Sequence, residues 1–394
     1  MKLDVKRPDH LVPDYSLTGD LLSFSRCELQ YRFYNGSALP PSRPVQLWYG
    51  EFVHGTMEAA FRLWEADRDA LPFPWPYTPL GSGGPREPPP EGLPQHDLRV
   101  IGWPIEQTLA QEGKQARSRN ARQAAYRRAD RAINMLGPHL FPLISTAEQR
   151  VLGTRPLTAA NARSTRYALR GVIDVLGDVT LADPGDNVIL QAIKAACPDL
   201  NGDFEIIVDY KGARRPRHAG KHRDQHWELG KWQVQTYAWL RERQPDARPV
   251  AAGILIYVNE LAPSSSDVGQ ILDEVKAGAT DVAPLAGSPD YYELHAWQPG
   301  ANSQLSEEFR FARALRVIPV STASMDEATT RFDEMVADIE RNVAREAETG
   351  SISAGWKATC EDTATCSACD FLSFCPKPAS GADRSSGNGA DDFA

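Results

Sequence analysis

The sequence predicts an α/β protein, and three observations carry this prediction. Strand and helix patterns alternate between residues 147 and 258, two apolar strands run directly into carboxylates, and a segment rich in Pro and Gly separates this region from N-terminal helices. The expected strands cover residues 147–153, 167–179, 204–210 and 250–258, and a helix covers 227–243. Alternation of this kind is typical of a sheet flanked by helices.

The rest of the chain divides by composition. Helical periodicity predicts helices over 16–34, 49–66 and 325–348, and a basic helix over 105–136 that ends at Gly137-Pro138. The expected regions are the N-terminal helices (1–68), a surface insertion (69–104), a basic helical region (105–146), the core with insertions (147–350), a cysteine cluster (351–378) and a disordered tail (379–394). The stretch 183–202 fits either a short helix or a loop, and 263–289 is interpreted as another insertion.

Charge and hydropathy exclude two classes of protein. A formal charge of −9 argues against a protein that coats nucleic acid without specificity, which needs positive potential. Positive charge is instead local, over residues 114–131 and 211–223, where it fits either solvated surface or contact with DNA. No secretion signal or long apolar run is recognised, so we expect a cytoplasmic protein without a membrane partner.

Acidic residues stand at the ends of two apolar strands. The first strand ends in Arg170-Gly-Val-Ile-Asp174, and the second in Ile-Ile-Val-Asp209-Tyr-Lys211. Side chains alternate along a strand, so Asp209 and Lys211 share one face, and Asp174 joins them if the strands pair. Neighbouring carboxylates repel unless a cation neutralises them, which indicates a divalent metal site. Such a metal can activate water for phosphodiester hydrolysis.

These residues resemble the PD-(D/E)XK nuclease superfamily, and the helix that follows resembles its RecB-like branch. Gln233-Val-Gln-Thr-Tyr237 is similar to the Gln-xxx-Tyr motif of that branch, although an amphipathic helix with a buried Tyr would look the same. The resemblance implies a restriction-endonuclease-like fold, with a central mixed sheet flanked by helices. It also implies that Gln233 and Tyr237 lie beside the metal.

The same resemblance extends upstream. Gly50-Glu-Phe-Val-His54 is similar to the Gly-xxx-His segment whose histidine is a metal ligand, although a lone His in an apolar helix is often a core residue. The implied ligands are His54, Asp174, Asp209 and the carbonyl of Tyr210, with Glu148 at or near the site. A histidine among oxygen ligands favours Mn²⁺ over Mg²⁺, and either ion fits.

Four of the six cysteines follow residue 359. Cys366, Cys369 and Cys375 can supply three thiolates to one centre, and a fourth ligand is needed. Cys360 would complete a zinc knuckle. Cys27 would complete a four-iron, four-sulfur (4Fe–4S) cluster, because its segment resembles the N-terminal helix of RecB-like nucleases that hold such a cluster, except that Glu28 stands where Pro usually follows.

The resemblance implies a metal-dependent DNA nuclease, an exonuclease acting on DNA ends or single strands in repair or in CRISPR or phage defence. No complete P-loop is recognised, so unwinding would come from a partner helicase or another repair or defence protein. The loop after Lys211 is expected to track DNA phosphates through Arg214, Arg215, Arg217, Lys221 and Arg223. The alternatives are a nucleic-acid-binding or scaffolding protein without turnover, and a zinc-stabilised interaction module.

Overall fold

A six-stranded mixed sheet forms the centre of the molecule. The computed structural model describes residues 12–36, 45–80, 87–160, 162–219, 224–367 and 369–383. Its strands are β1 (Asp14–Ser16), β2 (Ile144–Pro156), β3 (Arg166–Leu181), β4 (Gly202–Lys211), β5 (Val250–Tyr257) and β6 (Leu315–Pro319). They are ordered β1-β3-β4-β5-β6, and β2 also pairs with β3.

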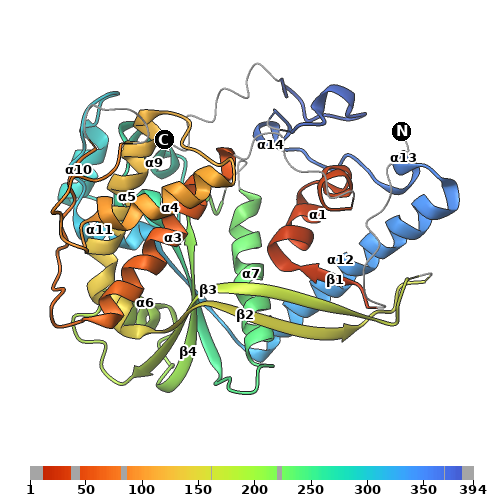
Figure 1. Cartoon of the computed structure of the whole chain (residues 1–394), viewed down its shortest axis with the longest axis horizontal. Helices are drawn as coiled ribbons and strands as arrows, with labels where there is room; N and C mark the ends of the chain where they lie inside the picture. The colour runs from red at the N-terminus through yellow and green to blue at the C-terminus, as the bar shows by residue number, and fades with distance from the viewer. Residues whose placement is uncertain are drawn as a thin grey trace.

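Strand β3 organises the sheet because it pairs along both of its edges. One edge pairs antiparallel with β2 over most of its length. The other edge pairs first with β1, which is parallel and ends at Ser16 opposite Arg170, and then with β4, which is antiparallel and begins at Val175 opposite Val208. Residues 171–174 therefore lie between the ends of two different neighbours. Figure 1 shows β2 and β3 as a long ribbon that continues past β4.

The helices lie on both faces of the sheet and at its ends. The described helical segments before β4 are η1 (Leu17–Leu21), α1 (Leu22–Arg26), α2 (Glu28–Tyr31), η2 (Arg32–Gly36), α3 (Val45–Ala66), α4 (Leu98–Gln111), α5 (Arg119–Leu140), η3 (Phe141–Leu143) and α6 (Val188–Ala196). Those after it are α7 (Gln225–Arg241), α8 (Val258–Leu261), α9 (Ser265–Lys276), α10 (Pro289–Ala296), α11 (Glu307–Ala314), α12 (Thr322–Thr349), α13 (Ile352–Gly355), α14 (Thr363–Ser367) and η4 (Leu372–Phe374).

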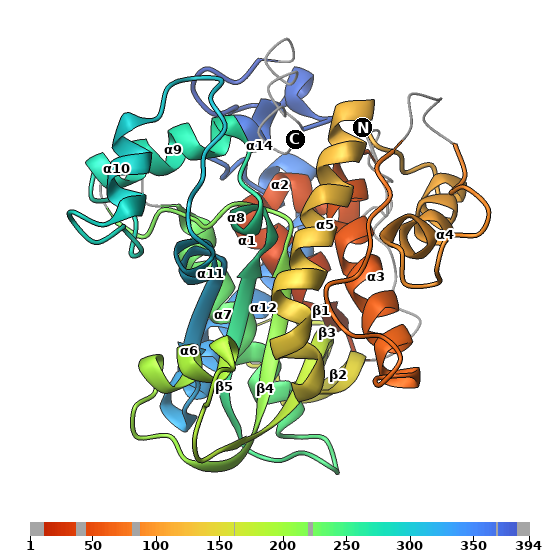
Figure 2. The ribbon, with the colours of Figure 1, turned by 90° about the vertical axis from the view of Figure 1, so that its left-hand side faces the viewer.

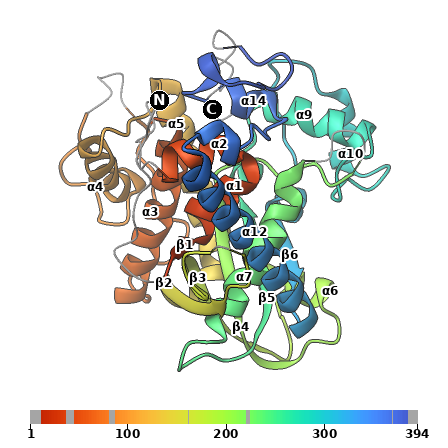
Figure 3. The same ribbon diagram turned by 90° about the vertical axis from the view of Figure 1, so that its right-hand side faces the viewer.

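Two hydrophobic cores separate the layers. On one face, α3, α5, α6 and α8 pack against Val175, Ile206, Val208 and Ile254 of the sheet. Figure 2 shows α3 and α5 side by side in front of this layer. On the other face, α7, α12 and the N-terminal helices pack against Ile173 and Ile207, and Figure 3 shows α12 running beside α7. Apolar residues on alternate sides of β4 explain why this strand reads as a continuous apolar run.

The two ends of the described chain are joined through α12. The guanidinium of Arg32 donates to both carboxylate oxygens of Glu346 at 2.7 and 2.6 Å, and both residues are buried. Trp356 Nε1 donates to the same carboxylate at 2.6 Å. Such a bidentate, buried pair is costly to break from one side. It therefore fixes the N-terminal helices against the segment that precedes the C-terminal cysteines.

Several expected element boundaries are wrong. The basic helix over 105–136 is two helices, α4 and α5, separated near Gly113, which has a φ of +80°. Helix α5 also continues through Gly137-Pro138 to Leu140. At Gly137 a Cβ atom would come within 2.6 Å of the Phe73 ring, so this glycine permits close packing rather than ending the helix.

The expected insertions are more ordered than their composition suggested. Leu71, Trp75 and Leu80 of the Pro-rich segment are buried in the core beside α3 and α5. In the second insertion, Ser264 caps α9, which forms a small separate core with α10 and α11. The ambiguous stretch 183–202 contains α6. The expected helix over 16–34 is interrupted at Cys27, whose backbone is extended with a φ of −163°. Of the expected tail, residues 384–394 lie outside the described ranges.

Within the described ranges, no helix combines the length and the apolar composition needed to cross a lipid bilayer.

Candidate active site

The two carboxylates predicted from apolar strands meet at the junction within the sheet. Asp174 lies in β3 where its neighbour changes from β1 to β4, and Asp209 lies in β4 near the end of that strand. The backbone N–H of Tyr210 donates to Asp174 Oδ2 at 3.1 Å, which ties the two strands together at this point. The structure therefore brings together the acids that strand pairing predicted.

Lys211 is held between two partners. Its Nζ atom lies 2.5 Å from Asp209 Oδ2 and donates to Gln233 Oε1 at 2.7 Å. Gln233 Nε2 in turn donates to Asp209 Oδ1 at 3.2 Å. Asp209 and Gln233 are each only 4% exposed, whereas the Lys211 side chain is 27% exposed. Two partners thus hold the ammonium group, and part of the Lys211 side chain is exposed.

Tyr237 reaches the site because β3 carries a glycine opposite it. A Cβ atom at Gly171 would lie 2.4 Å from Cε1 of the Tyr237 ring. Tyr237 is one helical turn after Gln233 and is 3% exposed. The spacing of four residues places both side chains on the face of α7 that covers the strand ends.

His54 completes the group from the opposite layer. Helix α3 places its ring so that Nδ1 lies 3.3 Å from Asp174 Oδ2 and Nε2 lies 2.6 Å from the carbonyl oxygen of Tyr210. The sequence predicted His54, Asp174 and the Tyr210 carbonyl as ligands of one metal ion. In the structure they contact one another.

The side chains of the site shift one another's pKa values. Burial opposes protonation of His54, but the Asp174 carboxylate outweighs it and raises the pKa of the imidazole to about 9. Burial alone would raise the pKa of Asp174, yet His54 and Lys211 hold this pKa below its usual value. Burial and the Asp174 charge raise the pKa of Asp209. Burial also opposes the charge on Lys211, but Asp209 outweighs it and the pKa of the ammonium is raised.

Glu148 lies at the rim of the same site. It lines a small pocket with His54 and Asp174, and its backbone has a φ of +54°, a conformation that non-glycine residues seldom adopt. Burial, Asp174 and Glu58 together raise the pKa of Glu148. Glu58, which also lines this pocket, was not singled out from the sequence, although its position four residues after His54 places it on the same face of α3.

The donor set of this site fits a divalent cation. Asp209 Oδ2 is buried and, among the described residues, has the Lys211 ammonium beside it but accepts no hydrogen bond. As the side chains lie, no group of three or more His, Cys, Asp or Glu within the described ranges is arranged to hold a metal ion. The ion pairs give the reason, because His54 and Lys211 occupy the carboxylate oxygens that a cation would take. Binding would require these cationic groups to release them.

The arginines after Lys211 do not face solvent as expected. The Arg215 guanidinium donates to Asp281 and to the carbonyl of Arg313, and the residue is 5% exposed. The Arg214 side chain is 12% exposed and lies 3.1 Å from Glu274. Glu274 and Asp281 already pair with these two groups, so the structure does not support the prediction that Arg214 and Arg215 track DNA phosphates.

The remaining members of that loop stay predictions. Arg217 has a side chain that is 36% exposed and lies 4.0 Å from Glu274. Lys221 and Arg223 lie outside the described residues. The basic stretch 114–131 is also partly structural, because the Arg122 guanidinium pairs with Glu106 inside the helical layer.

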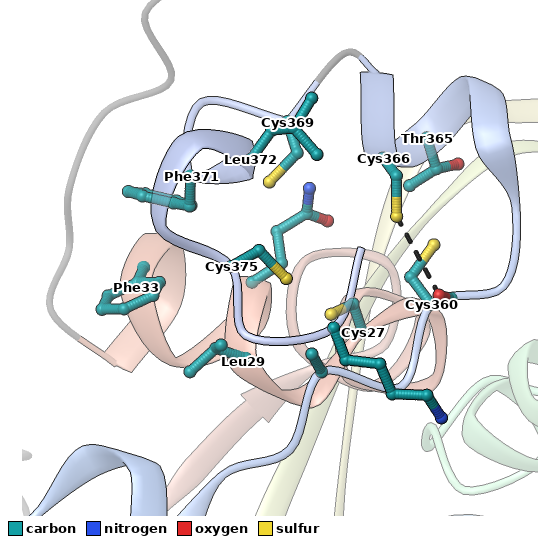
Figure 4. A pocket seen from close by; sticks show the side chains of 13 residues that line it. Cys27, Leu29, Phe33, Cys360, Thr365, Cys366, Cys369, Phe371, Leu372 and Cys375 are labelled. Carbon is teal, nitrogen blue, oxygen red and sulfur yellow. Dashed lines mark hydrogen bonds between the residues drawn. The ribbon is translucent and has the colours of Figure 1, made fainter. Parts of the chain in front are cut away.

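The cysteines of the two chain ends line one pocket. Among the residues that line this pocket are five cysteines, namely Cys27, Cys360, Cys366, Cys369 and Cys375. Figure 4 shows sulfur atoms from both chain ends around the same space. All five are free thiols, and burial raises the pKa of both Cys360 and Cys369. Cys197 lies elsewhere, at the end of α6.

Glu28 has a structural part in this arrangement. Its backbone N–H donates to Thr359 Oγ1 at 3.1 Å, and its carboxylate accepts from Asn342 Nδ2 at 3.1 Å. The next residue, Leu29, donates to the carbonyl of Lys357 at 2.9 Å. A proline at position 28 could not donate the first of these bonds. The departure from the usual Cys-Pro pair therefore adds a link between the two chain ends.

A protein-family model matches part of the chain. Residues 199–376 match the family model of the PD-(D/E)XK nuclease superfamily. This range contains Asp209, Lys211 and the Gln233–Tyr237 pair, whereas His54 and Asp174 precede it. No curated protein matches the chain. Members of this superfamily are generally nucleases and typically use Mg²⁺ or Mn²⁺. The match, on a mixed α/β fold consistent with the restriction-endonuclease-like architecture, supports placing this chain in the PD-(D/E)XK nuclease superfamily.

Proposed function

We propose that this chain is a metal-dependent DNA nuclease of the RecB-like type, which hydrolyses phosphodiester bonds at DNA ends or in single strands. One observation carries the proposal. The Lys211 ammonium is held by Asp209 and Gln233 on a side chain that is 27% exposed, while Asp174 and His54 stand on the other side of the Tyr210 backbone. A binding protein would not need a cation held in this way beside two carboxylates.

The metal in this proposal is Mn²⁺ or Mg²⁺, held by His54, Asp174, Asp209 and the carbonyl oxygen of Tyr210. When bound, the ion would lower the pKa of a water molecule and offset charge on the transition state. Carboxylate and carbonyl oxygens suit both ions, and the imidazole favours Mn²⁺. Glu148 borders this group and would take part through a second contact with the ion or its water.

Lys211 would act on the reacting oxygen atoms. Its raised pKa keeps it cationic near neutral pH, so it can donate a hydrogen bond to the attacking hydroxide or to a phosphate oxygen. Gln233 positions the ammonium through its Oε1 atom and Asp209 through its Nε2 atom. Tyr237 would support Gln233 from the next turn of α7.

The biological setting rests on the resemblance to RecB-like nucleases. We propose a role as an exonuclease in DNA repair or in CRISPR or phage defence, with a helicase or another repair or defence protein as partner. Arg217, Lys221 and Arg223 remain the proposed phosphate contacts of the loop after Lys211.

A second cofactor belongs to the proposal. We propose a 4Fe–4S cluster held by Cys27, Cys366, Cys369 and Cys375, supported by the thiols from both chain ends around one pocket. Cys360 lines the same pocket, so a zinc site that includes it would use the same space. The cluster and the zinc site are distinguished by measuring iron, acid-labile sulfide and zinc in anaerobically purified protein. The measurement is repeated on Cys27→Ser and Cys197→Ser. Iron loss in Cys27→Ser alone supports the cluster, and stoichiometric zinc without iron contradicts it.

The activity is tested with end-labelled linear and circular single-stranded DNA in Mn²⁺ or Mg²⁺. An exonuclease degrades the linear DNA and leaves the circles intact. Cutting of circles would show an endonuclease. No metal-dependent cleavage of either substrate, by protein that binds the metal, would contradict the proposal and favour the binding or scaffolding role.

A further inference from the structure

We propose that the open side of the β2–β3 ribbon binds a single-stranded segment of the nucleic-acid substrate and leads it to Asp174. This inference rests on the proposed nuclease function and deepens it. The ribbon face is defined here by six side chains on the side away from α7 and α12, which are Arg150, Leu152, Thr154, Arg166, Arg170 and Val172.

Alternation along the two strands creates this face. Tyr167, Leu169 and Ile173 are fully buried toward α7 and α12, while residues 168, 170 and 172 point the other way. On that other side, Leu152 is 56% exposed and Val172 is 39% exposed. Leu152 and Val172 therefore give the ribbon face apolar contacts beside its arginines.

The ribbon face is basic in an acidic protein. Residues 149–156 and 166–173 contain no Asp or Glu, although the chain as a whole has a net charge of −9. Arg150 and Arg166 are exposed, and the Arg170 side chain is 61% exposed. Arg170 also lies 3.2 Å from Asp14, but an exposed pair of this kind is weak and can exchange its partner. Three arginines arranged along the ribbon match a polyanion.

The face is continuous with the candidate active site. Asp174 follows Arg170 and Val172 at intervals of four and two residues, so strand alternation places it in the same row. Glu148, two residues before Arg150 on β2, lines the same pocket as Asp174. At about 3.3 Å per residue, Arg170 and Arg166 stand about 13 and 26 Å from Asp174 along β3. A strand lying on this row would reach the carboxylates without a change of direction.

The chemistry favours one strand over a duplex and contact without sequence preference. The ribbon face is two strands wide except where β1 joins it beside residues 168–170, and neighbouring strand axes lie about 5 Å apart, which suits one backbone more closely than a double helix. None of its six side chains is aromatic, so base stacking does not contribute. Guanidinium groups would contact phosphates, and Leu152 and Val172 would contact sugars or base edges.

The first test is binding of a fluorescent 20-nucleotide single strand to full-length protein carrying Lys211→Ala, which keeps the DNA intact. Adding Arg150→Gln and Arg166→Gln should weaken binding about tenfold and reduce the slope of log K against log salt by about 1.4, since each lost phosphate contact is worth about 0.7. The matched control removes the same charge at the exposed Arg68 and Arg345 and should leave both quantities unchanged.

Any of four results would overturn the inference. The ribbon variant could keep the affinity and the salt slope of its parent. The control variant could lose as much affinity as the ribbon variant. A blunt duplex could bind as tightly as the single strand and lose as much affinity in the ribbon variant. Absence of any binding by the parent protein would overturn it as well.

Cleavage separates this inference from the proposed function. With Lys211 restored, Arg166→Gln alone should lower kcat/KM on the 20-nucleotide strand about threefold and leave kcat/KM on a trinucleotide unchanged, because a trinucleotide at Asp174 cannot reach Arg166, about 26 Å away along β3. Equal losses of kcat/KM on both substrates would contradict binding of the strand by the ribbon face. If the parent protein cleaves neither substrate, the proposed function fails. The binding measurement then still tests whether the ribbon face binds a single strand.

Discussion

The Nζ atom of Lys211 lies 2.5 Å from Oδ2 of Asp209, two residues earlier on the same strand. Residues at this spacing share a face of a strand, and burial of Asp209 beside it keeps water from weakening the pair. The pKa of the Lys211 ammonium is raised as a result, despite the burial that opposes its charge. Asp209 and Gln233 together therefore hold the charged Lys211 ammonium at the end of β4.

Gln233 links Lys211 to Asp209, and a single substitution tests this role. Gln233→Leu removes the acceptor of Lys211 and the donor to Asp209, and we expect kcat to fall about 10- to 100-fold, as for other residues that orient metal ligands. Gln235→Leu, on the same helix, is the control, because Gln235 Nε2 is buried without a hydrogen-bond partner among the described residues. Its thermal stability should be equal or higher and its kcat unchanged. Equal activity in the two variants would remove Gln233 from the site.

Gly171 is predicted to be intolerant of a side chain. In Gly171→Ala the new methyl group meets the Tyr237 ring at 2.4 Å, so the ring or the strand must move. We expect a loss of about 1–3 kcal/mol in the free energy of unfolding, together with lower activity. Gly50→Ala on α3 meets nothing within 4 Å and should gain up to about 1 kcal/mol. Chemical denaturation measures both. A Gly171→Ala protein as stable and active as the wild type would show that Tyr237 is not held against β3.

The site could be predicted from the sequence wherever strand geometry decides it. Asp209 and Lys211 share a face because of their spacing, and Asp174 joins them because β3 and β4 pair. His54 was expected from a resemblance, and its contact with Asp174 depends on how α3 packs on the sheet. Glu58 and the glycine at 171 carry no signal in a single sequence, because their importance comes from what lies opposite them.

The arginine loop shows where prediction from local charge fails. Arg214 and Arg215 have no acidic neighbours in sequence, yet their partners Glu274 and Asp281 lie 60 and 66 residues further along the chain. A run of positive charge therefore looks the same whether it faces DNA or a buried carboxylate. The break in the basic helix and the core packing of the Pro-rich segment have the same origin, since both depend on contacts with distant residues.

The pairing of Arg215 with groups inside the protein predicts that it contributes to stability. Arg215→Ala leaves Asp281 and two carbonyl groups without their donor, so we expect a loss of about 3 kcal/mol in the free energy of unfolding. Arg248→Ala breaks an exposed pair with Asp178 and should cost less than about 1 kcal/mol. Urea denaturation compares them. A stable Arg215→Ala protein with weaker DNA binding would restore the DNA-contact role of this loop.

The His54 pKa makes metal binding depend on pH. With a pKa of about 9, the metal-free imidazole is protonated near neutral pH and must lose a proton before it can bind Mn²⁺. The apparent affinity should therefore rise up to tenfold per pH unit below pH 9 and level off above it. His54→Ala should bind the ion more weakly at pH 9 and with a shallower pH dependence. Calorimetry in buffers of different ionisation enthalpy measures the protons released, and release of none at pH 7 would contradict this account.

The most direct test of the central claim is the cleavage of end-labelled single-stranded DNA in Mn²⁺ by the wild type, Asp174→Asn, Lys211→Ala and Asp178→Asn. Asp178 lies four residues after Asp174 on β3 and is exposed, so it is the matched control. We predict that the wild type and Asp178→Asn cleave the DNA, and that Asp174→Asn and Lys211→Ala remain folded and lose at least about 100-fold in rate. Equal cleavage by all four proteins would contradict the assignment of the active site.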